Sequence, residues 1–298
     1  MPPKTYLESL VTMAEDAKWP RAASLITDKD SPIGLLDIPA HQTSISPTNA
    51  HLTPAAIREA LKRYSTYSYS TATDIRQTAI QDLGFIENPD SNEAKTIATL
   101  QAAKKDLAIC LGGDNSITYA AVLGTLGQDL RDAGLITLDA HHDLRDGVSN
   151  GSPVRRLIEA GLNPKHIVQI GINDFSNSPE YAQLASDLGI TVITREEVAS
   201  LGIEAACKKA LGKMPSKVFV DFDVDVCDRS VVPACPAAAP GGISAFELRK
   251  AARLLVSDKR VRGIDVTEID ASKDSEDQRT VRLGGLVVLE ALAGYVDR

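Results

Sequence analysis

Short apolar runs alternate with segments of helical periodicity along most of the chain, and this alternation restricts the fold more than any other feature. Turn residues bound the runs, so we predict strands at residues 33–38, 79–84, 107–112, 135–140, 166–172, 189–194, 217–223 and 261–269. Strands separated by helices form βαβ units, in which helices cover both faces of a parallel sheet. The pattern therefore predicts an α/β fold with a mostly parallel sheet of about eight strands.

The helical segments have recognisable first residues. Thr53 followed by Pro54 fits an N-cap and a first-turn proline, and Ser244 with Glu247 fits a capping box. The last predicted helix covers residues 280–296. No linker, repeat or change of composition divides the 298 residues, so we expect a single domain over residues 1–298.

The composition excludes several classes of partner. A formal net charge of −8 disfavours binding to nucleic acid or to an anionic membrane, because both require a basic surface. The first residues lack the apolar core of a signal peptide, and no run reaches the roughly 18 apolar residues of a membrane span. We therefore expect a cytoplasmic protein.

The cysteines lack CxxC spacing, so we expect free buried thiols at Cys110, Cys207, Cys227 and Cys235.

Polar clusters follow four of the predicted strands at their carboxyl ends. The clusters are Asp114 and Asn115 after 107–112, Asp139, His141 and Asp143 in DAHHD, Asp223, Asp225 and Asp228 in DFDVDVCD, and Glu268 and Asp270 in DVTEID. Ligands of open parallel sheets bind beyond the carboxyl ends of the strands, so we expect the four clusters to converge there.

Converging carboxylates require neutralisation. Each carboxylate pair about 4 Å apart repels by roughly 4 kcal/mol at an effective dielectric constant near 20. Two divalent cations would cancel the charges of Asp139, Asp143, Asp223 and Asp225, and His141 would add a nitrogen ligand. This oxygen-rich set suits Mn²⁺ better than a structural zinc site, with zinc, cobalt and iron as alternatives. Two such ions can lower the pKa of a shared water molecule, which predicts hydrolytic chemistry.

A single DxD or DxH motif after a strand is more often a turn or a cap, so the prediction depends on finding two such motifs together. We interpret Cys227 as a packing residue, and His41, His51 and His166 as satisfied polar residues. GGDNS at residues 112–116 lacks the GxxxxGK[ST] pattern of a phosphate-binding loop.

Together these motifs resemble those of the ureohydrolase superfamily, which includes arginase, agmatinase and formimidoylglutamase. GGDNS is similar to GGDHS of that family, DAHHD to DAHxD, and DFDVDVCD to xFDxDxxDP. The stretches DFSNSPEY and PACPAAAPGG resemble the formimidoylglutamase branch. The resemblance implies an arginase-like three-layer αβα fold, two Mn²⁺ ions per subunit, and a homo-oligomer that is a trimer or a hexamer.

The resemblance also implies a role for each matching residue. The metal ligands would be Asn115, Asp139, His141, Asp143, Asp223 and Asp225, with Asp139 and Asp223 bridging both ions. Glu268 would hold the amidinium of the substrate, and Asp114 and Asp228 would orient ligands. Asp143 or Asp228 would relay a proton, and His142 would replace a shuttle histidine that the chain lacks. Asn150 and Ser152 in NGSPVRRL would contact the substrate.

The implied substrate is a small molecule, N-formimidoyl-L-glutamate, which would yield L-glutamate and formamide in histidine degradation. Its two carboxylates need positive side chains nearby, and Arg145 and Arg229 each follow a metal motif. An amidinohydrolase that releases urea from agmatine or guanidinobutyrate is the alternative. A catalytically weak paralogue is a third hypothesis, because Asn115 replaces a usual histidine ligand.

Overall fold

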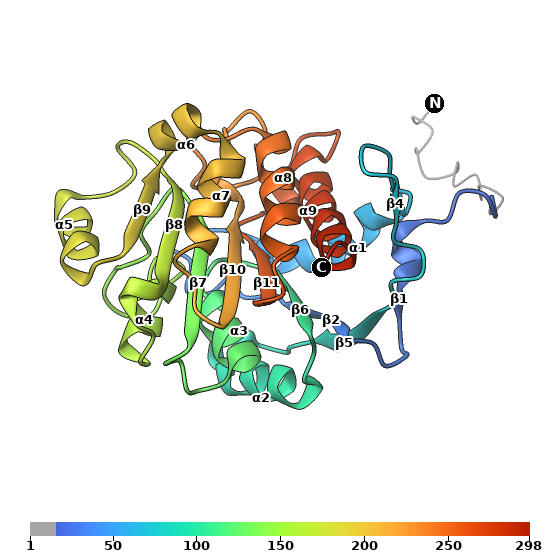
Figure 1. The fold of residues 1–298 in the computed structure, drawn as a ribbon, viewed down its shortest axis with the longest axis horizontal. Helices are drawn as coiled ribbons and strands as arrows, with labels where there is room; N and C mark the ends of the chain where they lie inside the picture. The colour runs from blue at the N-terminus through green and yellow to red at the C-terminus, as the bar shows by residue number, and fades with distance from the viewer. Residues whose placement is uncertain (1–15) are drawn as a thin grey trace, which may run out of the picture.

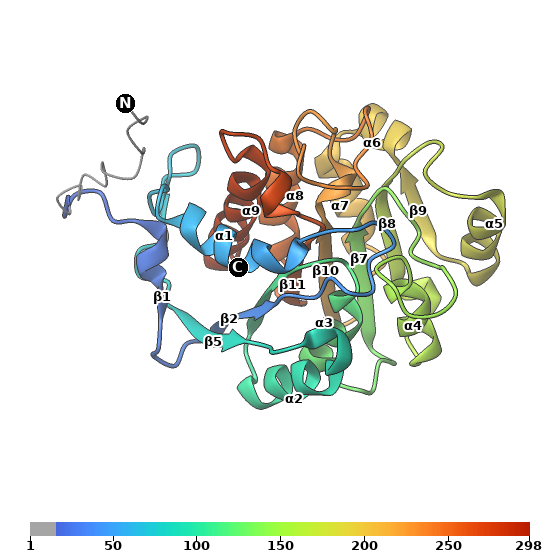
Figure 2. The same cartoon turned by 180° about the vertical axis from the view of Figure 1, so that it is seen from behind.

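A computed structural model describes residues 16–298. The first residues, for which we expect no signal peptide, lie outside the described part as far as residue 15. Within the described residues a nine-stranded sheet lies between two helical layers (Figures 1 and 2). Its strands are β1 (Ile26–Thr27), β2 (Ile33–Ile38), β5 (Ile80–Phe85), β6 (Leu107–Gly112), β7 (Ala133–Leu138), β8 (Ile167–Ile172), β9 (Thr191–Thr194), β10 (Lys217–Asp223) and β11 (Val261–Thr267). The single α/β domain and its three layers are as predicted.

The strand order is β1-β5-β2-β6-β11-β10-β7-β8-β9, and every neighbouring pair is parallel. All the predicted strands are present, and the two-residue β1 is an addition too short to show periodicity. A separate hairpin joins β3 (Tyr67–Ser68) to β4 (Thr73–Asp74). Two strands end two residues before their predicted ends: β7 ends at Leu138 instead of residue 140, and β11 ends at Thr267 instead of residue 269.

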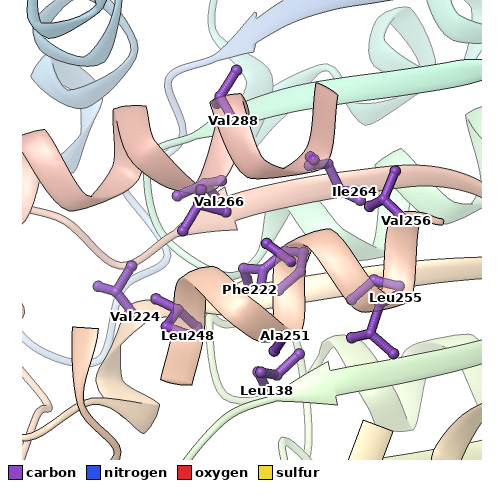
Figure 3. Packing of buried hydrophobic residues seen from close by; sticks show 14 of the residues in the cluster. Leu138, Phe222, Val224, Leu248, Ala251, Leu255, Val256, Ile264, Val266 and Val288 are labelled. Atoms are coloured by element: carbon purple, nitrogen blue, oxygen red, sulfur yellow. The ribbon is translucent and has the colours of Figure 1, made fainter. Parts of the chain in front are cut away.

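Helices cover both faces of the sheet. One layer contains α1 (Thr53–Leu61), α6 (Arg195–Leu201), α7 (Ile203–Leu211), α8 (Ala245–Val256) and α9 (Arg279–Val296), and the other contains α2 (Glu93–Ala103), α3 (Ile117–Leu126), α4 (Pro153–Glu159) and α5 (Pro179–Leu188). Strand residues alternate between the two layers. Phe222 packs against the α8 layer (Figure 3). Phe219, on the other face of the same strand, packs against the α3 layer. Burial on both faces explains the nearly continuous apolar runs of the sequence.

The predicted helix starts have different outcomes. Ser244 accepts a hydrogen bond from Glu247 N, and Glu247 Oε2 accepts one from Ser244 N, so the capping box of α8 is confirmed. The N-cap assigned to Thr53 is wrong, because a 3₁₀ turn at Ala50–Leu52 runs directly into α1 and Thr53 is its first helical residue. The Thr53 hydroxyl instead donates to the backbone oxygen of Ile269.

The expected thiols and the lack of a membrane span also agree with the structure. All four cysteines are free and buried. Among the described residues, no helix has the length and hydropathy needed to cross a bilayer.

Candidate metal centre

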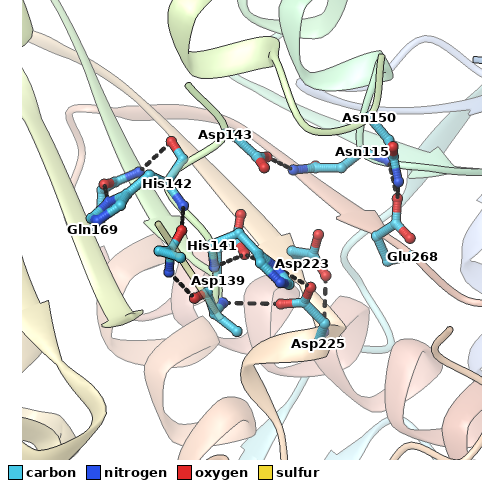
Figure 4. Close-up of polar contacts among 12 residues, drawn as sticks. Asn115, Asp139, His141, His142, Asp143, Asn150, Gln169, Asp223, Asp225 and Glu268 are labelled. Atoms are coloured by element: carbon cyan, nitrogen blue, oxygen red, sulfur yellow. Dashed lines mark hydrogen bonds and ion pairs between the residues drawn. The ribbon is translucent and has the colours of Figure 1, made fainter. Parts of the chain in front are cut away.

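The sheet order brings the four polar clusters together. Strands β6, β11, β10 and β7 are consecutive neighbours in the sheet, although they are not consecutive in the sequence. Neighbouring strands lie about 4.8 Å apart, so the residues that follow these parallel strands meet at one edge. The predicted convergence is therefore what the fold produces (Figure 4).

Asp139, His141 and Asp225 form the tightest part of this cluster. His141 Nδ1 lies 2.7 Å from Asp225 Oδ2 and 3.4 Å from Asp139 Oδ1. Each of the three residues offers a ligand atom, and these atoms all lie within 4.8 Å of one another. Asp139 Oδ2 is buried and has no hydrogen-bond partner among the described residues.

Asp223 and Asp143 complete the group of carboxylates. Asp223 is the last residue of β10, and its Oδ1 accepts a hydrogen bond of 2.8 Å from Asp225 N. Asp143 lies beyond the end of β7 with a φ of 54°, a conformation that few residues other than glycine adopt. The backbone is therefore not extended at Asp143.

The electrostatics show that negative charge is concentrated here. Burial and the surrounding carboxylates raise the pKa of Asp139 and of Asp223 well above the usual value, and burial raises the pKa of Asp143 to about 7. Burial disfavours a charged His141, but the acidic neighbours, Asp225 first, outweigh it and raise the pKa of His141 to about 9. For Asp225 burial is likewise outweighed by the contact with His141, which lowers the pKa of its carboxyl.

Asn115 differs from the expected metal ligand in its orientation. Its Oδ1 accepts hydrogen bonds from the hydroxyls of Thr118, at 2.9 Å, and Thr267, at 3.0 Å. Its Nδ2 donates to Asp143 Oδ2 at 2.6 Å. In this arrangement the amide nitrogen, a hydrogen-bond donor, faces a carboxylate of the cluster, and the amide oxygen faces the two threonines.

Glu268 follows β11 directly and has a φ of 64°. Its Oε1 accepts hydrogen bonds from Asn115 N, at 2.8 Å, and from Asn150 Nδ2, at 2.9 Å. Burial, with a smaller contribution from Asp114, raises the pKa of Glu268 to about 8. Asn150 Oδ1 accepts from Ile45 N at 3.0 Å, so this side chain orients Glu268 and an adjacent loop.

The cluster opens into a pocket of about 380 Å³. Its polar and charged lining residues include His141, His142, Asp143, Arg145, Asn150, Asn177, Tyr181, Asp223, Asp225 and Glu268. Arg145 is the one lysine or arginine among its lining residues, all of which belong to the described part of the chain. The pocket is therefore acidic at the cluster, with a single guanidinium at its wall.

Three of the expected site residues lie elsewhere. Ser152 is buried and uses its hydroxyl within its own turn, donating to Ser149 O at 2.9 Å. Arg229 donates to the backbone oxygens of Cys235 and Pro236. Asp228 accepts hydrogen bonds from Ser230 N and Gly241 N, which gives it a role in its own loop. None of the three lines the pocket, so the structure gives no support to their expected contacts with substrate and proton.

Asp114 and His142 are held by other polar groups. Asp114 is fully buried and accepts from the hydroxyls of Ser44, at 2.7 Å, and Ser116, at 2.5 Å. The His142 ring points toward β8, where its Nδ1 contacts Gln169 Oε1 at 2.7 Å (Figure 4). His142 thus lines the pocket while one of its two ring nitrogens is already engaged.

Sequence reasoning missed Gln169, Asn177 and the buried pair Asp221 and Asp265. Gln169 and Asn177 bind the backbone of the DAHHD segment, and Asp221 and Asp265 are Cα partners on β10 and β11. The signal for three of them was a polar residue inside an otherwise apolar strand, because buried polar groups need partners. Asn177 lies in a loop and gave no comparable signal.

The residues present suit divalent cations. Carboxylates and an imidazole supply oxygen and nitrogen donors, as manganese and related ions prefer. The unpartnered Asp139 Oδ2 and the raised pKa values of Asp139 and Asp223 indicate negative charge that the protein itself leaves uncompensated. The fold and the site thus define an α/β protein with a carboxylate-rich centre at the carboxyl edge of its sheet.

Comparison with known proteins gives the family. The sequence profile of the arginase family matches residues 31–294. Formimidoylglutamase from Halalkalibacterium halodurans is 35% identical over 283 residues, which cover 88% of this chain and 86% of that protein. The Bacillus subtilis formimidoylglutamase is 33% identical over 276 residues, which cover 87% and 86%. The chain therefore belongs to the arginase family.

Comparison with solved structures agrees with this family assignment. The crystal structure of the Bacillus subtilis formimidoylglutamase has a TM-score of 0.87 at 31% identity, with 97% of this chain and 96% of that chain covered. Trypanosoma cruzi formiminoglutamase with Mn²⁺ has a TM-score of 0.86 at 25% identity, with 94% and 99% covered. The similarity thus extends over nearly the whole length of both chains.

Proposed function

We propose that this protein hydrolyses the formimidoyl C–N bond of N-formimidoyl-L-glutamate, which yields L-glutamate and formamide. The observation that carries the proposal is a pocket in which Glu268, the carboxylate cluster and Arg145 line the same space. Glu268 suits a cationic amidine, and Arg145 suits a carboxylate at the other end of the substrate. The match to relatives named formimidoylglutamase supports this choice.

We propose two Mn²⁺ ions as the cofactor. Asp139, His141, Asp143, Asp223 and Asp225 would hold them, and Asn115 would fix Asp143 from behind. Such ions supply Lewis acidity and make water a nucleophile near neutral pH. The Mn²⁺ in the Trypanosoma cruzi structure supports the choice of metal.

Glu268 would bind and orient the formimidoyl group. Two donors fix its Oε1, and among the described residues no hydrogen bond engages its Oε2. A carboxylate with one committed oxygen presents the other in a single direction, which favours an amidinium bound there. A bound cation also stabilises the ionised form of Glu268, whose pKa burial raises to about 8.

The reaction adds the oxygen of water to the formimidoyl carbon and breaks the bond from that carbon to the glutamate nitrogen. The leaving amine must gain a proton. Asp143 lines the pocket, and we propose that its carboxyl relays this proton. Asp228, the other residue considered for this step, lies outside the pocket.

One product assay tests the proposal. The manganese-loaded protein is incubated with N-formimidoyl-L-glutamate and, separately, with agmatine, guanidinobutyrate and guanidinopropionate, and formamide, glutamate and urea are measured. We expect formamide and glutamate in equal amounts. Urea as the main product would indicate an amidinohydrolase instead, and no product from any compound would indicate a catalytically weak paralogue.

A variant links activity to the centre. Asp223→Ala should abolish both turnover and manganese binding, since it removes a carboxylate that lies between β10 and the rest of the cluster. Full activity in this variant would refute the assignment of the site.

We also propose that the protein acts in the cytoplasm as a homo-oligomer, a trimer or a hexamer. The resemblance of its motifs to the ureohydrolases supports this assembly. Light scattering coupled to size exclusion measures the mass directly, and a monomer of 31.8 kDa would contradict it.

A further inference from the structure

Two amide side chains hold the DAHHD segment from the side of β8 (Figure 4). Gln169, a buried residue of β8, donates from Nε2 to His142 O at 3.0 Å, and its Oε1 contacts His142 Nδ1 at 2.7 Å. Asn177, in the loop between β8 and α5, donates from Nδ2 to Ala140 O and accepts from His142 N, each at 2.9 Å. Each amide therefore forms two hydrogen bonds to the segment.

The chemistry of the partners fixes which way each amide points. A backbone carbonyl oxygen only accepts hydrogen bonds, so the amide nitrogen of Gln169 and that of Asn177 must face the segment's carbonyls. Their oxygens then face His142, where the backbone N–H and the ring Nδ1–H donate. The two amides therefore make four hydrogen bonds to the segment. In each of them a donor faces an acceptor.

The segment needs such support. Strand β7 ends at Leu138; beyond it the backbone bonds to the β8 side that remain are Asp139 N to Ile170 O and Asn173 N to Ala140 O, and Asp143 adopts a φ of 54°, a strained conformation for a residue with a side chain. Asp139 and Asp143 also repel each other when both are ionised, as metal binding requires. The hydrogen bonds at Ala140 and His142 lie between these two carboxylates in the chain, where they can oppose both effects.

We propose that Gln169 and Asn177 are positioning residues that hold residues 139–143 in the metal-binding conformation before any ion binds. The inference rests on the proposed metal centre. Both residues act through the backbone and the His142 ring, and no hydrogen bond from either amide to Asp139, His141 or Asp143 side chains occurs in the described structure.

The test compares Asn177→Ala and Gln169→Leu with Asn173→Ala. Asn173 is a matched control from the same loop: its backbone N donates to Ala140 O at 3.1 Å, whereas its side chain only accepts from Asp174 N. Calorimetry gives the Mn²⁺ affinity and stoichiometry of each protein. Hydrogen exchange of the metal-free proteins gives the protection of the amides at residues 139–143, and circular dichroism verifies folding.

We expect Mn²⁺ to bind roughly 10- to 100-fold more weakly to Asn177→Ala and Gln169→Leu, as when other residues that orient metal ligands are removed. The His142 amide, which donates to Asn177, should exchange faster in metal-free Asn177→Ala. Asn173→Ala should match the unaltered protein in both measurements. Asn177→Asp keeps the acceptor for His142 N but loses the donor to Ala140 O, so it should also bind Mn²⁺ more weakly.

The proposal is overturned if the folded variants bind Mn²⁺ within twofold of the unaltered protein and exchange at the same rate. Gln169 is fully buried, and if circular dichroism shows that Gln169→Leu does not fold, the variants of the partly exposed Asn177 decide the question alone. If the unaltered protein itself binds no Mn²⁺, the proposed function fails, and the exchange of the metal-free proteins still tests the positioning role separately.

Discussion

Asn150 Nδ2 donates to Glu268 Oε1 at 2.9 Å, across 118 residues of sequence. The same Asn150 accepts from Ile45 N, so it joins the carboxylate expected to bind substrate to the loop that forms one wall of the pocket. Asn150 was expected to contact the substrate itself. Its hydrogen bonds indicate that it acts mainly by directing Glu268.

Asn150→Ala should therefore weaken the binding and turnover of N-formimidoyl-L-glutamate. A hydrogen bond to a charged group contributes roughly 1.5 to 3 kcal/mol, so kcat/KM should fall roughly 10- to 100-fold. Steady-state kinetics measures the change. Val148→Ala, at an exposed position of the same loop, is the control and should behave like the unaltered protein. An unchanged kcat/KM in Asn150→Ala would argue that Glu268 needs no such partner.

Arg145→Ala should raise the KM for N-formimidoyl-L-glutamate up to about fivefold, because an exposed guanidinium–carboxylate contact contributes up to roughly 1 kcal/mol. A formimidoyl amine without carboxylates should show no such increase. Arg229→Ala is the matched control, since Arg229 binds backbone oxygens outside the pocket. Equal losses for both substrates would show that Arg145 does not recognise the carboxylate.

Gly113→Ala should destabilise the fold by about 3 kcal/mol, the upper end for overpacking. A Cβ at this position would lie 1.8 Å from Ala40 O, and Asp114 N already donates to that oxygen at 2.9 Å. The two backbones cannot separate without displacing Asn115 as well. Urea denaturation measures the loss. Gly212→Ala, where a Cβ meets no atom closer than 3.4 Å, should have little effect, and a similar small effect of Gly113→Ala would contradict the packing argument.

The metal-free protein should become less stable as pH rises from about 5 to about 9. The folded state raises the pKa of Asp143 from 3.8 to about 7 and that of His141 from 6.5 to about 9. The folded protein therefore holds more protons than the unfolded chain in this range, and releasing them costs stability. Thermal unfolding should show a decrease of several degrees. Excess Mn²⁺ should remove most of it, because the ions replace the protons. A midpoint that rises with pH without metal would contradict this charge balance.

Local features of the sequence predicted the strands and the carboxylate cluster well. Val220 and Leu111 belong to runs that are apolar because both sheet faces are buried, and Asp139 and Asp223 follow such runs at the edge where ligands bind. The same patterns carry no information on hydrogen bonds made across long sequence separations. The amide of Asn115 points its nitrogen into the cluster because Thr118 and Thr267 occupy its oxygen.

Contacts that motif matching does not read explain the other differences. Ser152 and Arg229 belong to stretches that resemble the family, but their hydrogen bonds are local, within their own loops. Gln169 is a single polar residue in the buried strand β8, and its partner His142 lies 27 positions earlier. Adjacency in sequence therefore identified the chemistry of the centre better than it identified which side chains face it.

The position of β11 between β6 and β10 governs when the centre can exist during synthesis. A nascent polypeptide that has reached residue 230 already contains every cluster except Glu268, yet its sheet lacks the strand that joins the β6 half to the β10 half. Pairing of β11 with β6 and β10 brings Glu268 next to the other clusters. Translation products that stop short of β11 would consequently carry the acidic residues without an assembled centre, so metal loading should require β11.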